Sequence, residues 1–124
     1  MMIVAGPIAS LTLIGIAHAQ IVTLTNGYCD ETEGAYGHAY IISEEFYREA
    51  GVGTVGSGNG CDYRVVDAAR FEWSGGSSNH GPSGLQGYNV FYYDTTHWVT
   101  QATGTHRICA VPAICGTAKN TLAN

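Results

Sequence analysis

The side chains most able to carry chemistry are four histidines and one carboxylate beside a tryptophan. The imidazoles of His38, His80, His97 and His106 are general acid–base candidates, because histidine titrates near neutral pH. They are scattered along the chain, and a lone histidine is interpreted as a surface or packing residue. Glu72 precedes Trp73 and shares a face of a predicted strand with Arg70, where a paired or solvated carboxylate is the plain interpretation.

Four cysteines predict structural sulfur chemistry. An even number of cysteines in a short secreted chain is typical of a disulfide framework, and Cys29, Cys61, Cys109 and Cys115 allow three pairings. A bridge from Cys29 to the C-terminal pair would close a long loop and contribute most to stability. Only Cys109 and Cys115 lie near each other, so no zinc site, other metal or cofactor is expected.

The N-terminal segment and the charge bound the class of protein. Residues 1–19 carry no charged side chain and end in Ala17-His18-Ala19, which predicts a secretory signal peptide cleaved before Gln20, with a retained membrane anchor as the alternative. Residues 20–124 then form one domain. With 5 Lys and Arg against 10 Asp and Glu, the net charge of -5 argues against duplex DNA binding, which needs clustered cations.

The elements that would position these residues read as a mixed α+β domain. Ile42, Phe46 and Ala50 recur every four residues after a capping Ser43, which predicts one short α-helix over 43–50. An edge strand is expected over 20–24, strands over 61–66 and 70–73, a surface loop over 74–87, and a hairpin whose strands are 88–93 and 98–103. The glycine-rich run 51–60 follows a helix and precedes a strand, so it does not fit a phosphate-binding loop. The expected architecture is the helix packed on an antiparallel β-sheet.

The order of these elements and several short motifs resemble the guanyl-specific ribonucleases secreted by fungi, above all their catalytically inactive relatives among the effectors of plant-pathogenic fungi. The resemblance covers about 80 of the 105 residues that follow the predicted signal peptide. Its motifs are Tyr28-Cys29, the 43–50 segment, Thr54-Val55-Gly56-Ser57, Phe71-Glu72-Trp73, Asn89-Val90-Phe91-Tyr92 and Trp98-Val99-Thr100-Gln101.

The resemblance implies a catalytic set that this chain has largely lost. Glu72 matches the general base, but Asn89 stands at the family's phosphate-holding Arg and Gln101 at its general-acid His. Neither amide can supply a proton or a positive charge, and each such group contributes a large part of the rate. The resemblance therefore implies a ribonuclease-like protein without ribonuclease activity.

Three functions follow as expectations. The first is a monomeric secreted effector, a virulence protein that binds a host plant protein, with RNA contact secondary, no membrane association, and Tyr88, Tyr92 and Trp73 as the binding surface. The second is an active guanyl-specific ribonuclease using Glu72 and His106, which requires those residues within about 10 Å. The third is an unrelated small disulfide-rich toxin or inhibitor, favoured by a Cys109–Cys115 bridge and by a sheet without a packed helix.

Overall fold

The computed structural model describes residues 15–29, 34–110 and 114–124, and these ranges contain strands but no helix. The strands are β2 (Gly15–Thr23), β3 (Tyr36–Glu44), β4 (Arg48–Val55), β5 (Tyr63–Trp73), β6 (Gly76–His80), β7 (Val90–Asp94), β8 (Val99–Ala110), β9 (Ile114–Cys115) and β10 (Lys119–Ala123).

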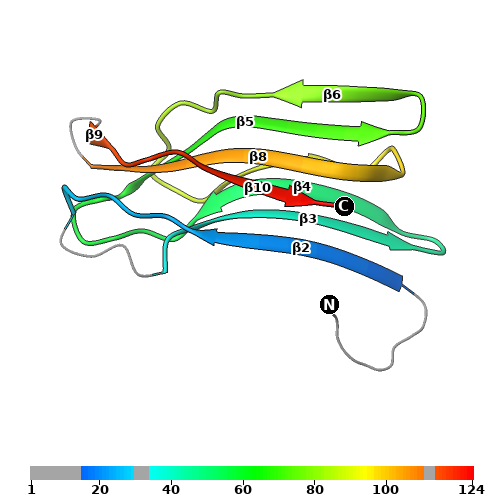
Figure 1. Cartoon of the computed structure of the whole chain (residues 1–124), viewed down its shortest axis with the longest axis horizontal. Coiled ribbons are helices and arrows are strands. Elements are labelled where there is room, and N and C mark those ends of the chain that lie inside the picture. Colours follow the sequence, from blue (N-terminus) through cyan, green and yellow to red (C-terminus); the bar gives the residue numbers. More distant parts are fainter. Residues whose placement is uncertain (1–14, 30–33, 111–113) are drawn as a thin grey trace.

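The strands form two antiparallel sheets that stack as a β-sandwich (Figure 1). One sheet has the order β10-β8-β5-β6, with β9 paired to the end of β8, and the other has the order β2-β3-β4-β7. Two antiparallel sheets with apolar inner faces bury those faces against each other, which is the common solution for such elements.

The core between the sheets consists mainly of small and medium-sized side chains. The four-stranded sheet contributes Ala39, Ile41, Ala50 and Val52, and the five-stranded sheet contributes Val66, Ala69, Phe71, Val99, Ala102 and Ala123. Alternate residues of β3 are buried, as the two-residue period of a strand requires. The outward residues of both sheets are therefore the surfaces available for recognition.

The predicted α+β class is wrong, and its error begins at residues 43–50. Instead, residues 43–44 end β3, residues 48–50 begin β4, and a tight hairpin turn joins the two strands. Backbone hydrogen bonds run in both directions between Glu44 and Tyr47. A four-residue spacing of apolar residues does not distinguish a helix from a strand, because residues four apart lie on one face in both. The turn leaves Phe46 with 93% of its surface exposed instead of packed.

The predicted hairpin over 88–103 is also wrong, although both of its strands exist. β7 pairs with β4, and β8 pairs with β5, so the turn after Asp94 carries the chain from one sheet to the other. The predicted loop 74–87 begins with β6, which forms a hairpin with β5. The predicted strands over 20–24, 61–66 and 70–73 are largely confirmed within β2 and β5.

The predicted signal peptide overlaps the sandwich. Its first 14 residues lie outside the described part, but residues 15–19 form the first half of β2 and pair with 40–44 of β3. Cleavage before Gln20 would leave four residues of β2 paired to β3. The cleavage site stays a prediction.

Candidate functional site

The three residues at the resemblance's catalytic positions are not gathered in one cluster. Glu72 and Gln101 are cross-strand partners on β5 and β8. The Glu72 carboxylate lies 3.1 Å from the Nε of Arg70, as the strand pattern suggested. Asn89 belongs to the segment before β7, where its side-chain oxygen accepts a hydrogen bond from the backbone N–H of Gly56 on the other sheet.

His106 lies in the core and not beside Glu72. It is 0% exposed and faces inward from β8. It stands five residues along β8 from Gln101, the partner of Glu72, and this corresponds to roughly 17 Å of strand. The two side chains also occupy opposite faces of the sheet. An active ribonuclease that uses Glu72 and His106 needs these residues close together, and this requirement is not met.

Hydrogen bonds hold the His106 ring neutral between the sheets. Its Nδ1 lies 3.0 Å from the Thr54 hydroxyl and its Nε2 lies 2.7 Å from the Thr121 hydroxyl. Because the Thr54 hydroxyl donates to the carbonyl of Val65, it accepts from Nδ1–H, and Nε2 is left to accept from Thr121. Burial lowers the pKa of His106 to about 4. The ring is a satisfied structural group.

The aromatic residues chosen from the sequence do not form one surface. Trp73 packs against the core cluster, and its indole stacks on the His97 ring at 3.7 Å between centroids. Tyr92 also packs against the core and stacks beside His80. Tyr88 is exposed in the segment between β6 and β7.

Asp94 and His97 form a polar pair at the turn between β7 and β8. The His97 Nδ1 lies 3.0 Å from an Asp94 carboxylate oxygen. Burial alone would raise the pKa of Asp94, but hydrogen bonds from His97 and Thr96 outweigh it and leave the pKa below its usual value. The pair ties down a turn that joins the two sheets.

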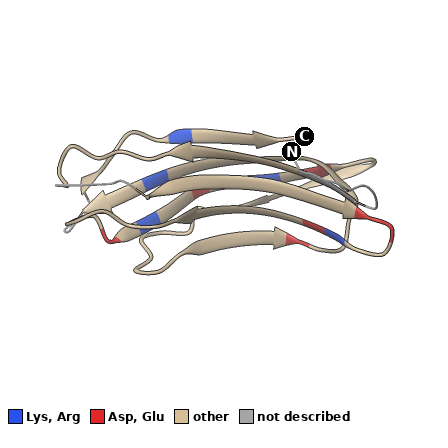
Figure 2. Cartoon of the chain, turned by 90° about the horizontal axis from the view of Figure 1, so that it is seen from below, with Lys and Arg blue, Asp and Glu red and all other residues tan. Residues whose placement is uncertain are grey.

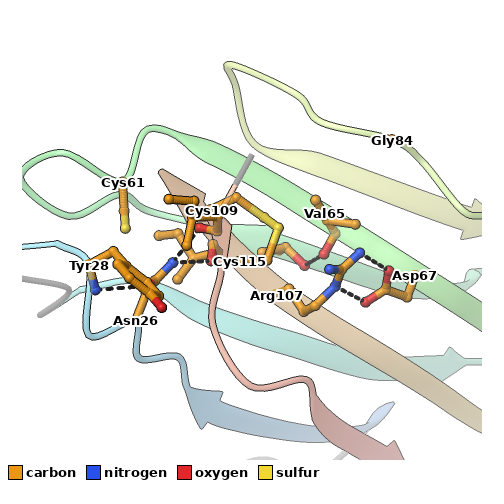
Figure 3. Close-up of a disulfide and its surroundings, with 12 residues drawn as sticks. Asn26, Tyr28, Cys61, Val65, Asp67, Gly84, Arg107, Cys109 and Cys115 are labelled. Atoms are coloured by element: carbon orange, nitrogen blue, oxygen red, sulfur yellow. Dashed lines mark hydrogen bonds and ion pairs between the residues drawn. A yellow bond between two sulfur atoms is a disulfide. The ribbon is translucent and has the colours of Figure 1, made fainter. Parts of the chain in front are cut away.

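The disulfides join Cys29 to Cys61 and Cys109 to Cys115. Cys29 is therefore not bonded to the C-terminal pair, the pairing that would have closed the longest loop. Asn26 lies between the two disulfides (Figure 3). Its side-chain amide donates to the carbonyls of Ile108 and Ile114, and its oxygen accepts from the N–H of Tyr28. Close by, Arg107 donates two hydrogen bonds to the Asp67 carboxylate, and these bonds raise the pKa of Arg107. This end of the sandwich is structural.

The outward face of the four-stranded sheet carries a group of four aromatic rings from β3 and β7. We call this set, His38, Tyr40, Phe91 and Tyr93, the aromatic face. The rings of Phe91 and Tyr93 are nearly parallel with centroids 5.5 Å apart, and those of His38 and Tyr40 are 5.2 Å apart. Tyr93 is 55% exposed.

Two glycines of β4 let these rings lie along the sheet. Gly51 pairs with Tyr40 on one side and Tyr93 on the other, and Gly53 pairs in the same way with His38 and Phe91. A β-carbon at Gly51 would collide with the Tyr40 ring, and one at Gly53 would collide with the Phe91 ring. The rings therefore cover the central strand and form a broad, shallow surface.

A carboxylate borders the aromatic face. Glu49 accepts hydrogen bonds from the hydroxyls of Tyr40 and Tyr47. Burial, together with the bond to Glu49, raises the pKa of Tyr40, and the bond to Glu49 raises that of Tyr47. Burial lowers the pKa of His38. At neutral pH the face thus presents uncharged rings with one carboxylate at its border.

The turn between β3 and β4 is acidic: it follows Glu44, contains Glu45 and is the red loop at the right of Figure 2. The one cation of this hairpin, Arg48 at the start of β4, lies over the Trp98 ring at 5.1 Å from its centroid. A depression of about 330 Å³ beside Tyr40 and Glu49 has no Lys or Arg among its described lining residues. The aromatic face is thus poorly suited to a polyanion.

The sequence carries a signal for this face. Phe91 and Tyr93 alternate with Val90 and Tyr92 along β7 and form its outer pair. The alternation of Gly51 and Gly53 within a strand marks a site where side chains from neighbouring strands approach the backbone.

Two searches of the described residues concern other kinds of site. No group of three or more His, Cys, Asp or Glu side chains among them is arranged to hold a metal ion. Within the same ranges there is no helix long and apolar enough to cross a membrane. Comparisons of the chain with family models, curated proteins and solved structures find no match.

Proposed function

We propose that this chain is a secreted, non-catalytic binding protein whose aromatic face docks onto a neutral polysaccharide. The observation that carries the proposal is the pair of glycines in β4 that allow four aromatic side chains to lie along one sheet face. Two disulfides are compatible with an extracellular protein.

The chemistry of a sugar chain fits this face. The C–H face of a pyranose ring is apolar and packs against an aromatic ring, while its hydroxyls need hydrogen-bond partners at the border. Tyr93 offers an exposed ring, and Glu49 offers a carboxylate that accepts hydrogen bonds. A broad platform suits a polymer surface better than a small enclosed ligand.

Other ligand classes fit less well. Strong RNA binding needs cations that follow the phosphates, and the depression beside Tyr40 and Glu49 has no Lys or Arg among its described lining residues. A host plant protein partner, secondary RNA contact and a monomeric state remain predictions from the sequence. The conditions set for an unrelated disulfide-rich toxin or inhibitor, a Cys109–Cys115 bridge and a sheet without a packed helix, both hold in the described part.

The proposal is tested by depletion of the purified protein onto insoluble cellulose, chitin and β-1,3-glucan. We expect wild-type protein to bind at least one of them and Tyr93→Ala to bind about tenfold more weakly, which corresponds to about 1.4 kcal/mol. Tyr28→Ala is the matched control, because Tyr28 is 70% exposed and lies outside the face. Failure to bind any polysaccharide, or equal binding by Tyr93→Ala, would overturn the proposal.

The absence of catalysis needs its own assay. Purified protein should leave guanosine-containing RNA intact, since Gln101 cannot act as an acid and His106 is buried in the core. Guanine-specific cleavage that disappears in Glu72→Gln would contradict this expectation.

A further inference from the structure

The outward face of the five-stranded sheet contains a groove of about 480 Å³, away from the aromatic face. This volume lies in the usual range for small-molecule sites. Two cross-strand rows of side chains form it. One row is Leu122, Thr103, Arg70 and Asn79, and the other is Asn120, Thr105 and Ala68.

The depth of the groove comes from Ala68. Its exposed methyl group ends the second row beside Thr105, and a longer side chain there would fill the space. Ala68 follows the bulge at which the register of β5 and β8 shifts, so the bulge brings this small residue to the outer face.

The walls of the groove offer unused hydrogen-bonding groups. Arg70 donates to Glu72 and to the side-chain oxygen of Asn79, and arginine has no acceptor, so the Asn79 oxygen must face it. The Asn79 NH2 group has no partner among the described residues. The Asn120 oxygen accepts from Thr105, which leaves its NH2 group open in the same way.

The local charge indicates the class of ligand. Arg70 is the one ionised side chain that lines the groove in the described part, and its ion pair with Glu72 neutralises it. The remaining polar groups are amides and hydroxyls, which match ligand hydroxyls that both donate and accept. The apolar floor of Ala68 and the side chain of Leu122 suit the C–H groups of the same ligand.

We propose that this groove binds one or two units of a neutral oligosaccharide, as a second site on the opposite side of the sandwich from the aromatic face. The groove site stands on its own contacts and does not depend on the platform. If both sites act, one molecule holds two sugar chains, and the two weak sites reinforce each other on a polymer.

The test uses the full protein and soluble tetrasaccharides of cellulose, chitin and β-1,3-glucan, with a tetramer of galacturonic acid as the acidic comparison. Binding is measured by calorimetry and by amide chemical shifts. We expect a neutral tetrasaccharide to bind in the groove, with amide shifts in β8 and β10, and Ala68→Tyr to abolish those shifts and the calorimetric binding that accompanies them. A double variant, Thr103→Val with Asn120→Ala, should weaken binding about tenfold, since it removes hydrogen bonds without filling the groove.

Two controls separate this site from its surroundings. Gln101→Ala lies on the same sheet face but outside the groove, and Tyr28→Ala lies outside both the groove and the aromatic face. Both variants should bind the soluble tetrasaccharide as wild type does. Amide shifts in β8 and β10 that vanish in Ala68→Tyr would support the site. Preference for the acidic tetramer would overturn the ligand class. Absence of binding, or unchanged binding by both groove variants, would overturn the site while leaving the aromatic-face proposal to its own assay.

Discussion

Acid should weaken this sandwich through His106, and the variant that removes the effect is His106→Gln. In the folded protein the buried ring is neutral, with a pKa of about 4 against the ordinary value of 6.5. Between these values the unfolded chain binds a proton that the folded chain does not. Stability is therefore complete above pH 6.5 and is lost as the pH falls toward 4.

The size of the loss follows from the two pKa values. At about 1.36 kcal/mol per pKa unit, the difference corresponds to about 3 kcal/mol of the free energy of unfolding. Protonation would place a charge between Thr54 and Thr121, whose hydroxyls are dipoles and not counterions. A loss of this size is a large part of the 5 to 15 kcal/mol typical of a domain, as an order of magnitude.

The assay is urea unfolding followed by tryptophan fluorescence at several pH values from 7 to 4. His106→Gln should be less stable than wild type at pH 7, because it loses packing and hydrogen bonds. Its stability should fall less than that of wild type over this range, and the fall that remains comes from groups such as His38, whose pKa burial also lowers. His80→Gln, which removes a half-buried histidine elsewhere, should retain the wild-type fall. Equal falls in wild type and His106→Gln would refute the reasoning.

Three further outcomes follow from the packing. Replacing Cys29 and Cys61 by serine should lower the free energy of unfolding by about 3.7 kcal/mol for a separation of 32 residues, measured in urea; an unchanged midpoint would contradict the bridge. Gly53→Val should displace the Phe91 ring, weaken binding in the polysaccharide depletion assay and lower the melting temperature, because its β-carbon would collide with the ring; wild-type binding would contradict the aromatic face. Asn26→Ala should lose about 2 to 4 kcal/mol in the same urea experiment, since it leaves buried backbone groups unpaired.

The strands were predictable where one face is buried and the other is solvated. β5 shows this alternation, with Phe71 inside and Arg70 and Glu72 outside, and it was identified. The hairpin turn at Glu44 to Tyr47 was not, because a four-residue spacing fits either period and the capping pattern favoured the helix. The pairing of β7 with β4 depends on contacts far apart in the chain, which local periodicity does not encode.

The candidate surfaces were less predictable than the strands. The aromatic face needs residues from β3, β4 and β7 in register, and the groove needs the bulge before Ala68. Both arise from sheet order, which no local pattern in the sequence specifies. The prediction that Arg70 and Glu72 share a face survived, because it depended on one strand alone.

Both disulfides and Asn26 lie at one end of the sandwich, and the opposite end is built from three turns: Glu44–Tyr47, the residues between β5 and β6, and those between β7 and β8. In Figure 1 these turns lie at the right, away from β9. Substitutions in the first two turns disturb neither cross-link, so sequence change can accumulate there while the disulfide-bonded end keeps the fold, whereas the third turn is held by Asp94 and His97. The architecture thus separates the part of the chain that is free to diversify from the part that must be kept.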